Sequence, residues 1–200
     1  GEVQDGAIAR VVAADGQFLG RAYCNRRSQI TLRILTWDES EAIDSSFWRR
    51  RLRRAIEGRR ALGLGDDTTA CRLVNAESDG LPGLIVDRYE DWLVLQSLTL
   101  GMDVLKPDVV GLLMDLLHPR GIFERSDADV RDQEGLGAVC GLLAGEQPPE
   151  RVAYREHGHR FLADVHRGHK TGAYLDQRDN RAKVAPWCRG AEVLNAFSYT

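Results

Sequence analysis

The stretch CRLVNAESDGLPGLIVDRYEDWLVLQSLTL, residues 71–100, decides the fold class. Its β-branched and aromatic residues suit the pleated, half-buried surface of a sheet. They predict three strands, near 72–76, 83–88 and 92–99. Turn-forming pairs separate these strands, at Asp79-Gly80, Pro82-Gly83 and Glu90-Asp91.

A helix is predicted before this sheet, in AIDSSFWRRRLRRAIEGRRALGLG, residues 42–65. Asp44, Ser45 or Ser46 can cap its first amides, and glycines at 63 and 65 can end it. Its apolar residues recur at helical spacing and predict one buried stripe, formed by Trp48, Leu52, Ala55, Ile56 and Leu62.

A second helix is predicted after the sheet and ends at Leu117. Its apolar stripe consists of Leu105, Val109, Leu112, Leu113 and Leu116. We expect Pro107 in its first turn, because proline inside a helix removes a hydrogen bond and clashes with the preceding turn. GIFERSD, residues 121–127, predicts another strand. This order of strands and helices indicates a compact α+β domain over 44–150.

The two ends of the chain predict separate pieces. AIARVVA, QFLGRAYC and ITLRILTW predict three short N-terminal strands, with a hairpin turn at Asp15-Gly16. GEQPPE, residues 145–150, predicts a linker, because its proline pair cannot join a sheet interior. After it we expect a hairpin turning at His157-Gly158, a helix from Leu175 to Ala185 and a strand at 191–197.

Composition indicates an ordinary globular protein, with 43% hydrophobic residues among 200. No apolar run approaches the ~20 residues of a membrane-spanning helix. The start, GEVQDGAIAR, lacks the basic and apolar regions of a signal peptide. The widely spaced Cys24, Cys71, Cys140 and Cys188 are typical of reduced thiols, so we expect a cytoplasmic protein.

Charge is unevenly distributed along the chain. Residues 1–60 hold 12 Lys and Arg against 8 Asp and Glu, residues 61–150 hold 6 against 17, and residues 151–200 hold 9 against 5. The basic ends are where a polyanion would bind. Arg49, Arg50, Arg53 and Arg54 on the first helix are candidate RNA phosphate contacts. The alternative is a solvated helix face paired with the acidic middle.

Four of the five histidines cluster, at 157, 159, 166 and 169. Their spacing suits zinc, but no cysteine or carboxylate completes a ligand set, so exposed or hydrogen-bonding histidines are favoured over a metal site.

GHKTGAYLDQR, residues 168–178, is the sharpest local signal. Its two glycines allow the backbone to approach a ligand closely, and Lys170 and Thr171 add a cation and a hydroxyl. Asp176, Gln177 and Arg178 stand at a predicted helix start, where free amides can meet a polar ligand. The alternative is a surface turn with Asp176 as an N-cap. AEVLNAFSYT, residues 191–200, then predicts a strand leading into a binding turn, or a plain edge strand.

Four motifs occur together in one known family. They are ESDGLPGLIVDRY (77–89), ERSDADVRDQEGL (124–136), GHKTGAYLDQR (168–178) and VLNAFSYT (193–200). With them, nearly the whole chain resembles the bacterial S-adenosylmethionine (SAM)-dependent 23S rRNA cytosine-C5 methyltransferases that carry an N-terminal PUA domain. The resemblance implies part of a PUA-like RNA-binding β-barrel at 1–43 and a central α+β domain at 44–150. It also implies the hairpin and beginning of a Rossmann-like methyltransferase domain at 151–200.

The resemblance also implies a cofactor site. Its residues form two groups around the methionine and ribose of SAM. The first group is Lys170, Thr171, Asp176, Gln177 and Arg178, and the second is Asn195, Phe197, Ser198, Tyr199 and Thr200.

In the family, a cysteine thiolate attacks C6 of the target cytosine before the methyl group reaches C5. That cysteine follows the part matched here, so the resemblance implies an enzyme whose catalytic residues are not among these 200. We expect this piece alone to be inactive. Two alternatives stay open: a non-catalytic RNA-binding module, or a related methyltransferase acting on a guanine amino group. An unpaired 191–197 strand would also favour a homodimer or segment exchange.

Overall fold

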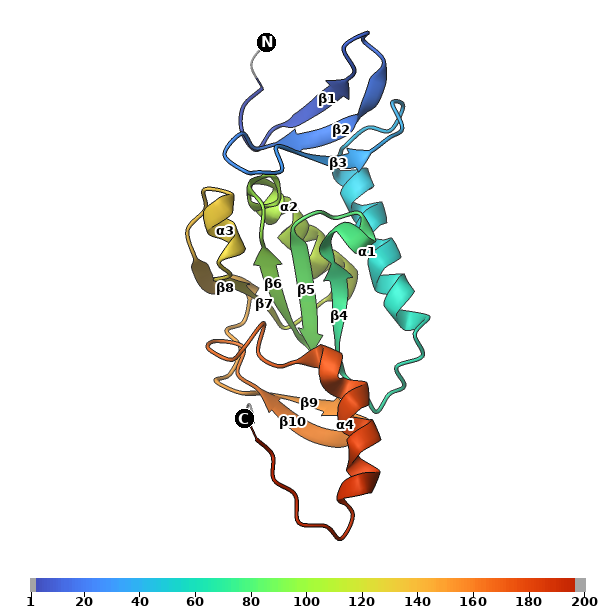
Figure 1. The fold of residues 1–200 in the computed structure, drawn as a ribbon, viewed down its shortest axis with the longest axis vertical. Coiled ribbons are helices and arrows are strands. Elements are labelled where there is room, and N and C mark those ends of the chain that lie inside the picture. Colours follow the sequence, from blue (N-terminus) through green and yellow to red (C-terminus); the bar gives the residue numbers. More distant parts are fainter. Residues whose placement is uncertain (1–2, 197–200) are drawn as a thin grey trace.

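A computed structural model describes residues 3–196 (Figure 1). Its first unit is an open antiparallel sheet of β1 (Ile8–Val12), β2 (Phe18–Cys24) and β3 (Leu32–Thr36). The turn at Asp15-Gly16 joins the first two strands, and Gly16 takes the positive φ that this turn requires. The three predicted N-terminal strands are confirmed, and in the described residues they form no closed barrel.

A five-stranded sheet in the order β4-β5-β6-β7-β8 forms the centre of the molecule. Its strands are β4 (Ala70–Asn75), β5 (Leu84–Tyr89), β6 (Trp92–Ser97), β7 (Gly121–Ser126) and β8 (Val139–Gly145). Only β6 and β7 run parallel, because α2 (Leu100–Leu117) connects them. The first four strands confirm the prediction. The sequence does not predict β8, since its glycines and alanine weaken the alternation.

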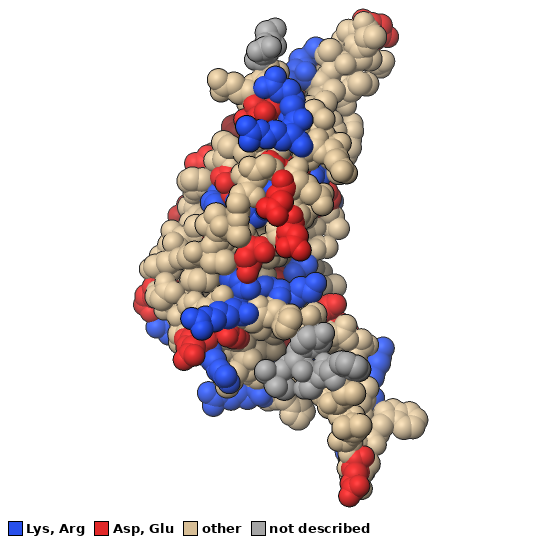
Figure 2. Space-filling model, turned by 60° about the vertical axis from the view of Figure 1, so that its left-hand side comes forward, with Lys and Arg blue, Asp and Glu red and all other residues tan. Residues whose placement is uncertain are grey.

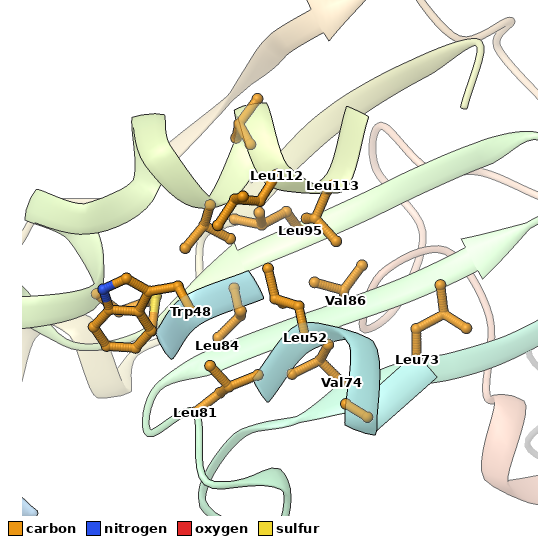
Figure 3. Close-up of a cluster of buried hydrophobic side chains, with 14 of the residues drawn as sticks. Trp48, Leu52, Leu73, Val74, Leu81, Leu84, Val86, Leu95, Leu112 and Leu113 are labelled. Carbon is orange, nitrogen blue, oxygen red and sulfur yellow. The ribbon is translucent and has the colours of Figure 1, made fainter. Parts of the chain in front are cut away.

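The helix α1 (Ser45–Arg60) packs beside α2 over one face of this sheet (Figures 1 and 3). Asp44 caps it by accepting a hydrogen bond from the Phe47 amide at 2.9 Å. The predicted stripe is buried apart from Leu62, which follows the helix end and is 66% exposed. Phe47, which is not part of the predicted stripe, is buried in the core and packs edge-on against the Trp48 ring.

The position of Pro107 in α2 differs from the prediction. The helix begins at Leu100, so Pro107 lies in its interior and not in the first turn. A proline there removes one helical hydrogen bond, which would be accepted by the Asp103 carbonyl. Fully buried Met102 precedes that break and buried Val109 follows it, and their packing holds both halves of the helix on the sheet.

The opposite face of the sheet packs against the hairpin of β9 (Val152–Glu156) and β10 (His159–Ala163). A second apolar cluster joins them. It contains Ala70, Tyr89, Trp92 and Val94 from the sheet region and Val152, Tyr154, Ala163 and Val165 from the hairpin region. The hairpin is confirmed at His157-Gly158, and residues 146–150 connect it to β8 without a helix or strand.

The C-terminal segment departs most from expectation. The helix predicted at 175–185 consists of η2 (Leu175–Gln177), α4 (Arg178–Val184) and η3 (Ala185–Cys188). The strand predicted at 191–197 is wrong for residues 191–196, which form none, and Leu194 is 91% exposed. A strand needs a hydrogen-bonded neighbour, and no strand of the described chain pairs with this segment. The described residues also contain no helix long and apolar enough to cross a membrane.

Candidate cofactor groove

A groove of about 750 Å³ runs along the edge strand β4. The C-terminal end of α1 borders it on one side, and the loop and short helices of residues 170–179 border it on the other. Lys170, Asp176 and Arg178 line it, opposite Arg59 and Arg72. The groove thus combines cations and carboxylates in a volume typical of small-molecule sites.

The predicted cofactor residues fall into different places. Lys170, Asp176 and Arg178 line the groove, whereas the side-chain carbonyl of Gln177 accepts a hydrogen bond from Asn180 at 2.8 Å. Thr171 is fully buried. Asn195 is exposed and is not among the residues lining this groove. Phe197, Ser198, Tyr199 and Thr200 lie outside the described residues.

A buried network fixes the predicted binding loop to the central sheet. The Thr171 hydroxyl donates to Oδ2 of Asp87 at 2.7 Å. The Tyr89 hydroxyl lies 3.0 Å from the Thr171 hydroxyl oxygen. Since the single Thr171 hydroxyl hydrogen is used on Asp87, Tyr89 is the donor in the second contact. The Tyr89 oxygen in turn accepts from the Ala173 amide at 3.1 Å. Burial raises the pKa of Tyr89, so it stays a neutral donor.

Asp87 also holds an arginine at the groove. Its carboxylate is 1% exposed and accepts from Nε and Nη2 of Arg72 at 2.8 and 3.0 Å. These hydrogen bonds raise the pKa of Arg72 despite its partial burial. A bidentate pair fixes the guanidinium plane, so Arg72 presents a fixed edge toward the groove. Neither residue was predicted. The sequence feature that could have indicated Asp87 is its charge in the otherwise apolar start of β5, LIVD.

A second anchor holds the loop at its beginning. The guanidinium of Arg125 donates to the carbonyls of Val165 and Gly168, at 3.2 and 3.0 Å, and to Asp127. At Gly168 a Cβ would lie 2.5 Å from the Asp164 carbonyl oxygen, so no side chain fits. The motif at 124–136 therefore supports the motif at 168–178.

The arginines of α1 divide into paired and free groups. Arg49 pairs with Asp115 at 2.8 Å, and Arg50 pairs with Glu41. Arg53 and Arg54 are exposed and have no ion pair within residues 3–196. The pair of Arg49 with Asp115 fits the alternative of a helix face paired with the acidic middle of the chain, whereas Arg53 and Arg54 stay predicted phosphate contacts.

The histidines and cysteines form no recognisable reactive cluster in the described chain. His166 meets the carbonyl oxygen of Pro148 at 3.1 Å and packs edge-on against Phe123. Within residues 3–196 no three His, Cys, Asp or Glu side chains could hold a metal ion. All four cysteines are free thiols. Cys71 lines the groove, and burial raises its thiol pKa, which disfavours the thiolate.

The fold is shared with solved structures of candidate methyltransferases. A candidate SAM-dependent methyltransferase from Streptococcus mutans superposes with a TM-score of 0.76 at 20% identity, covering 92% of this chain and 46% of that one. SMU.776, a candidate methyltransferase complexed with SAH, gives 0.77 at 20% identity, over 90% and 45%. At this identity the likeness shows the fold alone. A family model described as a PUA-like domain matches residues 1–37.

Sequence relatives carry one more specific name, Ribosomal RNA large subunit methyltransferase I. The protein of Shewanella amazonensis is 48% identical over 98% of this chain and 49% of its own length. That of Shewanella denitrificans is 48% identical over 100% and 50%, and that of Aliivibrio fischeri 42% over 100% and 50%. The chain thus spans about half the length of the curated relatives it matches.

Proposed function

We propose that this chain is part of a SAM-dependent methyltransferase that modifies large-subunit ribosomal RNA in the cytoplasm. The observation that carries the proposal is the 48% identity that extends over 98% of the chain to a relative of that name. The matched region includes the groove and both anchors of its loop, so the proposal does not depend on one motif.

The groove is proposed to hold SAM, which supplies an electrophilic methyl group when bound. The cofactor carries an amino acid zwitterion and ribose hydroxyls, and the groove offers groups of both charges. Lys170 and Arg178 suit the carboxylate, and Asp176 suits the ammonium or a hydroxyl. Thr171 and Gln177 act through the loop's conformation. Asn195 and the four residues after Ala196 are proposed to complete the wall.

RNA is proposed to contact the PUA-like sheet and the exposed arginines of α1. Arg53 and Arg54 have no carboxylate partner in the described chain, so a phosphate would meet no competitor there. Arg49 and Arg50 would first have to leave Asp115 and Glu41.

The proposed product is 5-methylcytosine in 23S rRNA, formed through a cysteine outside these 200 residues. None of the four cysteines here suits the role of nucleophile. Cys24 is buried, and burial raises the pKa values of Cys71 and Cys140. Cys188 precedes the VLNAFSYT motif at 193–200, whereas the family's cysteine follows it. We therefore expect no methyl transfer by the 200-residue chain alone.

The test compares this chain with the protein translated from its complete reading frame. Each is incubated with methyl-labelled SAM and unmodified 23S rRNA, and the nucleosides are separated by mass spectrometry. Labelled 5-methylcytosine from the longer protein alone is the expected result. Labelled methylguanine would show instead that the enzyme methylates a guanine amino group. Salt-sensitive RNA binding with no methyl transfer and no response to SAM would show that the protein is a non-catalytic RNA-binding module and not an enzyme.

A further inference from the structure

The edge strand β8 leaves one side of the central sheet open. It pairs with β7 from Ser126↔Val139 to Gly121↔Gly145, and no strand of the described chain lies on its other side. Figure 1 shows β8 at the outer left of the sheet. Every second residue of such a strand directs its backbone N–H and C=O groups outward, where they can pair with another strand.

The opposite edge of the same sheet is protected. Arg59 donates to the Arg72 carbonyl of β4 at 3.0 Å, and the Thr69 amide just before β4 donates to the Arg155 carbonyl of β9 at 3.0 Å. The helix α1 and η2 also lie against β4. Pairing with a further strand is therefore blocked at β4 and open at β8.

The sequence of β8 lacks the usual protection against pairing. GLGAVCGLLAG, residues 135–145, contains no charged residue and no proline. Val139 and Leu142 are 42% and 44% exposed, and Cys140 is exposed between them. Edge strands of monomeric proteins usually carry charges or prolines that prevent association. Figure 2 brings this side forward and shows uncharged tan surface beside groups of charged side chains.

We propose that β8 pairs antiparallel with β8 of a second copy of this chain, which joins two five-stranded sheets across a twofold axis. An identical strand fits because an antiparallel pair of equal strands is self-complementary. Any twofold register over 139–145 places only uncharged residues opposite each other, so no like charges repel. This contact does not need the 191–197 strand, and it is independent of methyl transfer.

The test is the oligomeric state of the 200-residue chain, measured by light scattering as its concentration rises. We expect the mass to double. Leu142→Lys should weaken the dimer about tenfold or more, because it places one charge from each copy in a strand pair that otherwise holds only uncharged residues. Leu162→Lys is the matched control, since Leu162 is 54% exposed on β10, away from this edge. It should leave the dimer intact.

Two further measurements keep the result decisive. Hydrogen exchange at the β8 amides should slow as concentration rises, which requires no substitution. Leu194→Lys tests association through the C-terminal segment. A chain that stays monomeric at every concentration overturns the proposal, and so does a dimer lost in Leu194→Lys but kept in Leu142→Lys.

Discussion

At the scale of single residues, Asp87 carries the most connections at the candidate site. One buried carboxylate neutralises Arg72 and orients Thr171, so it joins the sheet, the groove and the loop. The anionic form suits both partners, because each contact donates a hydrogen to it. An amide at this position would keep the shape and lose the charge.

Asp87→Asn is therefore expected to destabilise the protein by about 2–4 kcal/mol. The value lies below that for a fully buried ion pair because Arg72 is 40% exposed. Urea unfolding measures the change. Glu39→Gln is the control, since it breaks the exposed pair with Arg10 and should have little effect. Equal losses in the two variants would show that Asp87 has no special role.

At the scale of elements, two glycines of α2 meet opposite surroundings. A Cβ on Gly101 would lie 2.2 Å from Cγ of Tyr23, because the N-terminal sheet packs directly on the helix there. A Cβ on exposed Gly111 would meet nothing within 4 Å. The same substitution should thus have opposite signs at the two positions of one helix.

Gly111→Ala is expected to stabilise the chain by about 0.5–1 kcal/mol, because alanine restricts the unfolded chain and favours the helix. Gly101→Ala should destabilise it by about 1–3 kcal/mol through overpacking against Tyr23. Thermal and urea unfolding of both variants provide the comparison. Stabilisation by Gly101→Ala would mean that the sheet does not rest on α2 as described.

Elements were predictable where their signal was local. Alternation at β5 and β6, the Asp44 cap of α1 and the His157-Gly158 turn each reside in a few neighbouring residues. The strand predicted at 191–197 does not form over residues 191–196, because a strand depends on a neighbour that its own sequence does not reveal. Lys170 and Arg178 belong to one local motif, so the sequence could single them out, and both line the groove. The Asp87–Thr171 contact joins residues 84 positions apart, so no local pattern could indicate it.

At the scale of the whole molecule, Glu134 joins the N-terminal sheet to the centre. Its carboxylate accepts from Asn25 Nδ2 at 2.9 Å, Ser28 Oγ at 2.6 Å and Arg33 Nη2 at 2.9 Å, and from the Leu100 amide at 3.3 Å. Burial alone would raise the pKa of Glu134, but the hydrogen bonds from Ser28, Asn25 and Arg33 outweigh it and lower the pKa.

A lowered pKa in the folded state fixes the sign of the pH dependence. The stabilisation from Glu134 is fully present above the unfolded glutamate pKa of about 4.3 and is lost as pH falls through the folded value. Glu134→Gln should therefore be less stable than the parent at neutral pH, and the difference should shrink in acid. Urea unfolding at several pH values measures it, with exposed Glu57→Gln as control. A difference that stays constant with pH would contradict the assignment.

The second apolar cluster has a consequence for cutting the chain. Tyr89, Trp92 and Val94 are covered by Val152, Tyr154 and Ala163, which follow the connection at 146–150. Arg181 and Glu156 lie beyond the same connection and pair with each other at 2.6 Å, so the downstream piece keeps its own internal bond. A protease cut between Pro149 and Glu150 should therefore leave two polypeptides that copurify. The same two pieces, expressed separately and mixed, should bind each other as the halves of a split protein do.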